Sequence, residues 1–266
     1  MKIVVCIKEI PDPEAPTEEF KIDSIGNKVT ASKNVARVLN PFDEQAIEAA
    51  LRIKDAQGAT VTVVSLGNKL DRVAVKKSLH MGADDLILLE DQAFEGGDSW
   101  SIAHALALAI KKIGNFDLIL CGRQAADWNA GQVGLGIAEI LEIPSVAVAR
   151  KIEILDGKAK VEKVTASGYE VIEILLPALV TLSNELGEPR YPSIDGIRKS
   201  AKIQPTVWKP ADIGARPGDV GETGRKVKLM KLFQPAYEGN CLVIEGETVE
   251  EAVEKLALKL RHEKVI

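Results

Sequence analysis

The sequence predicts an α/β protein built on a doubly wound parallel sheet. Over the first 150 residues, short apolar runs alternate with helix-like stretches at close spacing, which is the order that right-handed crossovers between parallel strands produce. The apolar residues are mostly Ala, Val, Ile and Leu, and only 4% of the 266 residues are aromatic. Such a composition is typical of strands that are buried on both faces. We therefore expect a Rossmann-like sheet with an antiparallel extension and a long C-terminal arm.

The elements of the first half follow in order. Residues 2–7 form an apolar run and the first strand, and residues 9–27 are a Pro- and acid-rich excursion. Residues 28–39 are weakly patterned, with room for one short strand. Asn40-Pro41 then marks a helix start, because Asn caps and Pro fits the first helical position, and Gly58 ends this helix. We expect further strands at 60–66, 85–89, 116–121 and 146–148, and further helices at 70–81, 98–113 and 135–142.

The pattern changes after about residue 150. Alternating segments flank Asp156-Gly157, a pair typical of two-residue hairpin turns, and more strands are expected at 169–176 and 178–182. From residue 184 to about 246 prolines interrupt the chain and no periodicity holds, which is typical of a functional or partner-bound segment. A capping box at Thr248 then opens a last helix with an apolar stripe.

Composition and charge exclude several classes of function. The net charge is −5, and the sequence has no basic tract with interleaved aromatics, so nucleic acid is not an expected partner. No run approaches the roughly 18 apolar residues of a membrane span. Residues 1–10 lack the features of a signal peptide, and we expect a cytoplasmic protein. Because the three cysteines, Cys6, Cys121 and Cys241, lack metal-ligand spacing, no metal site is expected. No catalytic residue is expected either, since no histidine lies beside a Cys, Ser or carboxylate motif.

The stretch with the clearest chemistry is residues 122–134, a Gly-rich junction between a strand and a helix. Loops of this kind hold phosphates, because backbone N–H groups and the helix N-terminus point at the ligand. Arg123 can pair with a phosphate or with Asp127, and Asp127 can cap the next helix or accept from a ribose hydroxyl. The loop lacks the G-x-G-x-x-G and G-x-x-x-x-G-K-[ST] patterns, which argues against a nicotinamide site and against Walker-type phosphoryl transfer. A purely structural turn remains an alternative, as do a surface position for Trp128 and a core position for Phe42.

Several motifs, in order along nearly the whole chain, resemble the beta (small) subunit of electron-transfer flavoproteins. They are Ile7-Lys8, Asn40-Pro41-Phe42-Asp43, Met81-Gly82-Ala83-Asp84, Cys121-Gly122-Arg123-Gln124-Ala125, Asp127 with Gln132-Val133-Gly134, and Glu188-Pro189-Arg190-Tyr191. Each piece is weak alone, but the ordered set is specific. The resemblance implies a heterodimer whose alpha subunit holds most of the FAD. The beta subunit covers that FAD and binds a second nucleotide, which is AMP in most members and a second FAD, reduced by NADH, in electron-bifurcating members.

The resemblance also implies which residues bind. The adenine-nucleotide site would comprise Cys6, Asn40, Pro41, Phe42, Asp43, Leu66, Gly122, Arg123, Gln124, Ala125, Ala126, Asp127, Trp128, Asn129, Ala130, Gly131, Gln132 and Val133. The partner-binding residues would be Glu188, Pro189, Arg190, Tyr191 and Ile194, with Ile194 as the aliphatic anchor for a dehydrogenase. Phe42 would also lie near the FAD of the alpha subunit. We accordingly divide the chain into a nucleotide-binding α/β domain, 1–183, and a segment of recognition loop, arm and C-terminal helix, 184–266.

Three departures bear on the second nucleotide. Bifurcating members usually have Gly and Thr where this chain has Trp128 and Ala130, and they have Thr in place of Ile102. Phe94, Gly96 and Asp98 do fit the bifurcating pattern, so the two nucleotides remain alternatives and we favour AMP.

The function that we expect is a carrier rather than an enzyme. It would shuttle electrons from a flavin dehydrogenase, often of the acyl-CoA type used in fatty acid oxidation, to a quinone-linked membrane or iron–sulfur acceptor. An adenine-nucleotide ligase would need a phosphate loop after the first strand, where the chain reads Cys6-Ile7-Lys8-Glu9. A nucleotide-binding regulatory module is the third alternative.

Overall fold

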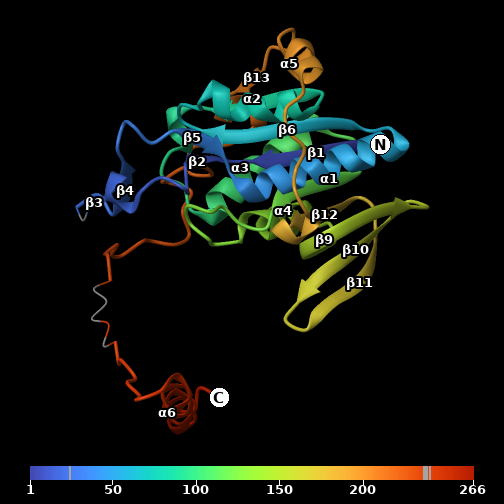
Figure 1. The fold of residues 1–266 in the computed structure, drawn as a ribbon. Helices are drawn as coiled ribbons and strands as arrows, with labels where there is room; N and C mark the ends of the chain where they lie inside the picture. Colours follow the sequence, from blue (N-terminus) through green and yellow to red (C-terminus); the bar gives the residue numbers. More distant parts are fainter. Residues whose placement is uncertain (24, 236–238, 240) are drawn as a thin grey trace. The chain divides into compact units, whose positions relative to one another are not determined.

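The computed structural model describes residues 1–23, 25–235, 239 and 241–266, and it confirms the α/β class. Among these residues the main sheet has nine strands: β1 (Lys2–Ile7), β6 (Thr60–Gly67), β7 (Asp85–Glu90), β8 (Leu118–Gly122), β9 (Ser145–Leu155), β10 (Lys158–Thr165), β11 (Gly168–Leu175), β12 (Ala178–Leu182) and β13 (Thr206–Trp208). Their order across the sheet is β11-β10-β9-β12-β8-β1-β6-β7-β13 (Figure 1). The pairings from β9–β12 to β7–β13 are all parallel, whereas β9, β10 and β11 pair antiparallel and form the expected extension.

Helices cover both faces of the sheet. The α-helices of the described residues are α1 (Pro41–Gln57), α2 (Arg72–Met81), α3 (Ser99–Ile113), α4 (Val133–Leu141), α5 (Ile194–Ser200) and α6 (Val249–His262). Apolar side chains of α1 and α2 pack with one face of β1, which presents Ile3, Val5 and Ile7. Side chains of α3 and α4 pack with the other face, which presents Val4 and Cys6. Each fully buried aliphatic side chain contributes about 1.5–3 kcal/mol, so these two layers hold the sheet in place.

Local sequence explains where the helices begin. The Asp71 carboxylate accepts hydrogen bonds from the N–H groups of Val73 and Ala74 at 2.8 and 3.0 Å, and so caps α2. Asp98 does the same for α3 through the N–H of Ser101, at 2.9 Å. These bonds satisfy donors that a helix start leaves unpaired.

Several sequence-based expectations need correction. Residues 9–39 were expected to hold one short strand, but they form two small antiparallel sheets, β2 (Glu9–Pro11) with β5 (Arg37–Leu39) and β3 (Phe20–Asp23) with β4 (Lys28–Ala31). The expected strand at 146–148 is the start of one long strand, β9, which continues through an irregularity where Val148 has φ 59°. Strand β12 joins the parallel sheet between β8 and β9 rather than the antiparallel extension. The aperiodic region after residue 184 contains α5 and β13.

The described chain separates into two compact units, Met1–Met230 and Lys231–Ile266. This division falls after residue 230 rather than after 183, because β13 pairs with β7 and keeps the intervening segment with the sheet. In the second unit, α6 is capped by the Thr248 hydroxyl, which accepts from the N–H of Glu251 at 3.2 Å. No residue of α6 is buried, so its apolar stripe has no cover within the described part of its unit.

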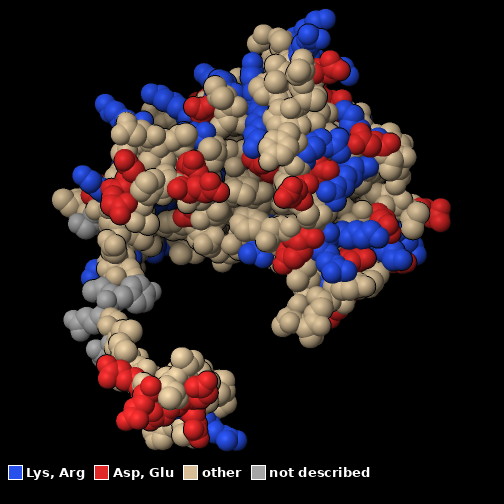
Figure 2. All heavy atoms as spheres, viewed as in Figure 1, with Lys and Arg blue, Asp and Glu red and all other residues tan. Residues whose placement is uncertain are grey.

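No helix in the described ranges is long and apolar enough to cross a membrane. The face of the molecule seen in Figure 2 intersperses Lys and Arg with Asp and Glu, as expected from a modest net charge. A single-sign surface for a polyanionic partner is therefore not visible on that face.

Candidate nucleotide site

The candidate site lies where the strand order reverses. Strand β1 pairs with β6 on one side and with β8 on the other, so the chain winds outward from β1 in both directions. At such a switch point the loops that follow the two central strands diverge, and a ligand can bind between them. These loops begin at Lys8, after β1, and at Gly122, the last residue of β8.

The Asp43 carboxylate joins these two strand ends. One oxygen, Oδ2, accepts a hydrogen bond from the backbone N–H of Lys8 at 2.7 Å, and Oδ1 accepts from the N–H of Gly122 at 3.0 Å. Asp43 is in the first turn of α1 and is 6% exposed. Burial raises the pKa of Asp43 to about 7, against the opposing effect of hydrogen bonds from Asn40, Lys8 and Gly122. The site thus contains a buried carboxyl group that titrates near neutral pH.

Gly122 is required for this arrangement. A Cβ atom at this position would lie 2.4 Å from Asp43 Oδ1, 2.7 Å from the carbonyl carbon of Phe42 and 2.8 Å from the backbone nitrogen of Asp43. Two of these atoms are backbone and cannot move aside. The glycine therefore lets the start of α1 approach the end of β8 closely.

Asn40 holds the loop from the same side. We expected its side chain to cap α1, but it makes no cap hydrogen bond. Its amide Nδ2 instead donates to the carbonyl of Gln124 at 2.9 Å, and its Oδ1 accepts from the N–H of Ala126 at 3.1 Å. Since Asn40 is 1% exposed, both bonds are shielded from water, and the first turn of the loop is fixed to α1.

The middle of the loop is a series of tight turns. The Ala125 carbonyl accepts from the N–H groups of Trp128 and Asn129, at 3.2 and 2.7 Å. Asn129 and Gly131 have positive φ, 54° and 64°. The turns lead to α4, which begins at Val133 without a side-chain cap from Gln132. The first N–H groups of a helix have no partner inside it, so α4 begins with donors available to a ligand.

Arg123 does not pair with Asp127, contrary to one of the two expectations for it. Its Nη1 donates to the Ser183 hydroxyl at 3.2 Å, and its guanidinium carbon lies 4.7 Å from the centre of the Phe42 ring, in cation–π contact. Its Nε is buried without a hydrogen-bond partner among the described residues. Ser183 also donates to the Glu185 carboxylate, which lowers the pKa of that glutamate. Sequence reasoning missed Ser183 and Glu185, because both follow β12, which was expected in the antiparallel extension rather than in the parallel sheet.

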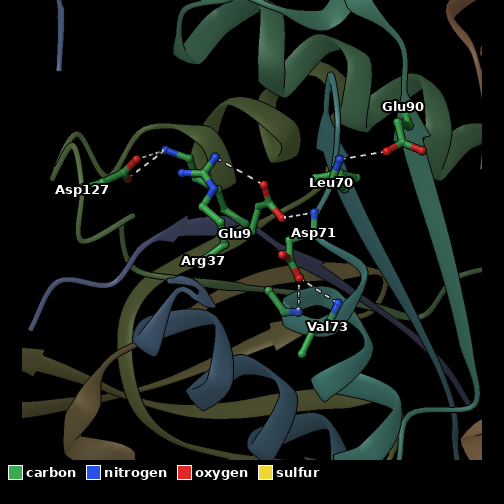
Figure 3. Close-up of polar contacts among 9 residues, drawn as sticks. Glu9, Arg37, Leu70, Asp71, Val73, Glu90 and Asp127 are labelled. Atoms are coloured by element: carbon green, nitrogen blue, oxygen red, sulfur yellow. Dashed lines mark hydrogen bonds and ion pairs between the residues drawn. The ribbon is translucent and has the colours of Figure 1, made fainter. Parts of the chain in front are cut away.

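Asp127 pairs with Lys8 instead. The ammonium Nζ of Lys8 lies 2.8 Å from both carboxylate oxygens of Asp127, so the ion pair bridges the end of β1 and the loop after β8. Both side chains keep contact with solvent, at 43% and 30% exposure. The place of Lys8 directly after the first strand makes it a candidate lining residue, although it is not among the binding residues that the resemblance implies. In Figure 3, the Asp127 carboxylate points toward the ion pair between Glu9 and Arg37.

The other predicted binding residues are placed in two ways. Cys6 and Leu66 belong to the apolar cluster on the α3 and α4 side, where Val133 also packs. Cys6 is in register with Cys121 on β8, and a hydrogen bond with Cys6, together with burial, raises the pKa of the Cys121 thiol. Trp128 lies in the loop and is 55% exposed. Ala130 and Gln132 also belong to the loop, and Pro41 is the first residue of α1.

The predicted partner-binding residues divide into an exposed group and a fixed one. Tyr191 and Ile194 are 87% and 71% exposed, with Ile194 as the first residue of α5. Arg190 is turned inward: its Nε lies 2.8 Å from Glu48 Oε2 and its Nη2 lies 2.9 Å from Asp55. Burial alone would raise the pKa of Glu48, but the bonds from Arg190 and Arg52 outweigh burial and lower it. Glu188 and Pro189 precede this anchor, exposed and half-buried respectively.

Comparison with known proteins places these features in a family. A family model for the electron transfer flavoprotein domain matches residues 28–213. The caffeyl-CoA reductase–Etf complex subunit CarD of Acetobacterium woodii is 40% identical, and the electron transfer flavoprotein subunit beta of Thermoanaerobacterium thermosaccharolyticum is 39% identical; both alignments cover 100% of each chain. The acryloyl-CoA reductase electron transfer subunit gamma of Anaerotignum propionicum is 33% identical over 97% of this chain and 99% of its own. The chain therefore belongs to the electron-transfer flavoprotein family and is one of its beta-type subunits.

Proposed function

We propose that this chain pairs with an alpha subunit in a heterodimeric electron-transfer flavoprotein and holds AMP at the loop of residues 122–133. FAD, held largely by the alpha subunit, supplies the electron-carrying chemistry, and this chain covers the FAD, orients it and makes no bonds itself. The observation that carries the nucleotide assignment is the double attachment of the loop to α1. Asn40 and Asp43, both buried, bind backbone groups of this loop at the switch point of the sheet.

The residues present fit an adenine nucleotide. The uncapped start of α4 supplies N–H donors for a phosphate, and Lys8 supplies a nearby cation. The apolar side chains of Cys6 and Leu66 would face the base, and the small residues from Ala125 to Gly131 would let a nucleotide approach the backbone. This fit supports holding a nucleotide rather than transforming it, because the Asp43 carboxylate is engaged with backbone N–H groups and the Asp127 carboxylate with Lys8.

We propose further that the exposed residues Tyr191 and Ile194 bind a flavin dehydrogenase. An exposed aromatic and an exposed aliphatic side chain beside a short helix have the character of interface anchors. Arg190 has a different role in this proposal, because its guanidinium is already paired with Glu48 and Asp55. It would fix the base of the recognition loop rather than contact the partner.

Two candidate routes for the electrons are proposed. Electrons would arrive from an acyl-CoA-type dehydrogenase, as in fatty acid oxidation, and leave to a quinone-linked membrane or iron–sulfur acceptor, in the cytoplasm. A second candidate is favoured by the names of two relatives, which belong to caffeyl-CoA and acryloyl-CoA reductase systems. In that candidate the complex delivers electrons to a reductase of unsaturated CoA thioesters, with a second FAD in place of AMP and NADH as the donor.

Co-expression with a candidate alpha subunit tests the proposal. The expected result is a 1:1 complex that carries the yellow absorbance of bound flavin. Failure to isolate such a complex from any alpha subunit encoded by the same organism would contradict the heterodimer assignment. Reduction of the complex by a dehydrogenase, or by NADH, then separates the two candidate routes.

A further inference from the structure

The ion pair between Lys8 and Asp127 joins the end of β1 to the loop of the candidate nucleotide site. It is half-exposed at both ends, and such pairs contribute little to stability. The loop is already fixed by the buried bonds of Asn40, and the strand ends by those of Asp43. The pair can therefore be broken by a ligand at little loss of stability.

The backbone of Lys8 is held rigidly, whereas its side chain is not. Its N–H donates to Asp43 at 2.7 Å, and its carbonyl accepts from the N–H of Asn40 at 2.9 Å. This fixes the position from which the flexible side chain extends across to the loop. An ammonium group on a four-carbon chain can reorient around such a fixed base.

The other cation of the site is engaged elsewhere. Arg123 donates to Ser183 and packs on the Phe42 ring, so its guanidinium is directed away from Asp127. Lys8 is thus the cation whose charge reaches the loop that leads into the uncapped start of α4. A helix N-terminus and an ammonium group together favour an anion with several oxygen atoms.

We propose that Lys8 makes this site selective for the phosphate of its nucleotide, and that Asp127 is the carboxylate which the phosphate displaces from Lys8. This inference rests on the proposed adenine-nucleotide function. The carboxylate acts as an internal competitor that neutralises Lys8 until a phosphate arrives. The same reasoning holds for AMP and for the AMP half of FAD, since both place a phosphate next to the adenosine.

The test measures the affinity of the nucleotide-free, full-length chain for AMP and for adenosine by isothermal titration calorimetry. Relative to wild type, Lys8→Gln should weaken AMP binding about tenfold or more and leave adenosine binding within about twofold, because only AMP carries the phosphate charge. Lys8→Arg, which keeps the charge, should retain the preference for AMP. Lys33→Gln, at an exposed lysine outside the site, is the matched control and should change neither affinity.

Asp127→Asn tests the displacement. Removing the competing charge should not weaken AMP binding and should strengthen it by roughly two- to fivefold. Equal weakening of AMP and adenosine by Lys8→Gln would overturn the phosphate role of Lys8, and so would an unchanged affinity for AMP. Tenfold weaker AMP binding in Asp127→Asn would overturn the competitor role. If wild type binds neither compound, the proposed nucleotide function itself fails, which is a distinguishable result.

Discussion

The carboxylate of Asp43 accepts a hydrogen bond from the backbone N–H of Gly122 at 3.0 Å, although 79 positions separate the two residues. The same carboxylate accepts from the N–H of Lys8, so one buried group connects the first helix to the ends of two central strands. The candidate nucleotide loop starts from this connection. Its geometry leads to predictions about stability, about pH dependence and about partner binding.

Gly122→Ala should destabilise the protein and abolish nucleotide retention. The new methyl group would overlap Asp43 Oδ1 and the backbone of Phe42, so the start of α1 must move away from β8. We expect a loss of about 1–3 kcal/mol in the free energy of unfolding, measured by urea denaturation. Gly239→Ala, where no atom of the described residues beyond the chain neighbours lies within 4 Å of the added Cβ, is the control and should be neutral. A fully stable Gly122→Ala variant would show that the close approach is not needed.

Asn40→Ala should release the loop from α1. The variant loses both bonds and leaves the half-buried carbonyl of Gln124 and N–H of Ala126 without their partner, which costs about 2 kcal/mol. Hydrogen exchange at the loop amides should accelerate accordingly, and nucleotide should be lost on purification. The same change at Asn34, which is exposed, should alter neither property. Unchanged exchange in Asn40→Ala would contradict the attachment.

The pKa of Asp43 makes stability depend on pH. Because the folded pKa, about 7, is raised above the ordinary value of 3.8, the folded state binds the proton more tightly than the unfolded state does. The stabilisation is complete below about pH 4 and is lost as pH rises through about 7. Between pH 5 and 7 the free energy of unfolding of wild type should fall by about 2 kcal/mol relative to Asp43→Asn, which cannot titrate. Parallel pH profiles for the two proteins would contradict the raised pKa.

Arg190→Met should weaken the base of the recognition loop. Glu48 is buried, and removal of the Arg190 guanidinium takes away its 2.8 Å partner, so that Glu48 keeps the bond from Arg52 and the 3.1 Å bond from the backbone N–H of residue 190. We expect a loss of about 1–3 kcal/mol in the free energy of unfolding. Arg198→Met is the matched control, because that arginine is 78% exposed and its distance to Asp195 is 3.9 Å. Equal effects of the two substitutions would mean that the buried pair has no special role.

Ile194→Ala should affect partner binding rather than stability, because this side chain is 71% exposed. Thermal stability should stay unchanged, while the rate at which a flavin dehydrogenase reduces the complex at limiting concentration falls about tenfold, the usual effect of losing an interface anchor. Ile25→Ala, at a residue 96% exposed on a different loop, should leave that rate unaltered. A normal rate for Ile194→Ala would remove Ile194 from the proposed interface.

The sequence was most informative where local chemistry decides the structure. Helix starts at Asp98 and at Asn40-Pro41, and the turn at Asp156-Gly157, depend on neighbouring residues and were predicted in place. The sequence was least informative where pairing between segments far apart in the chain decides the structure. Strand β13 is short and aperiodic, and only its pairing with β7 makes it a strand.

The site residues show the same contrast between local signals and distant contacts. Gly122 and its loop were predicted from a strand–helix junction, which is a local signal. The hydrogen bonds of the Asn40 side chain were not predicted, because its partners, Gln124 and Ala126, lie more than 80 positions away. The ion pair between Lys8 and Asp127 was not predicted for a related reason, since it exists only once β1 and β8 are neighbours.

The nucleotide content of the purified heterodimer tests the central claim most directly. Acid release followed by chromatography and quantification gives the number of each nucleotide per complex. We predict one FAD and one AMP, and two FAD without AMP would instead support the second candidate. A complex that releases FAD alone, with one molecule per heterodimer, would contradict the claim that this chain holds a nucleotide of its own.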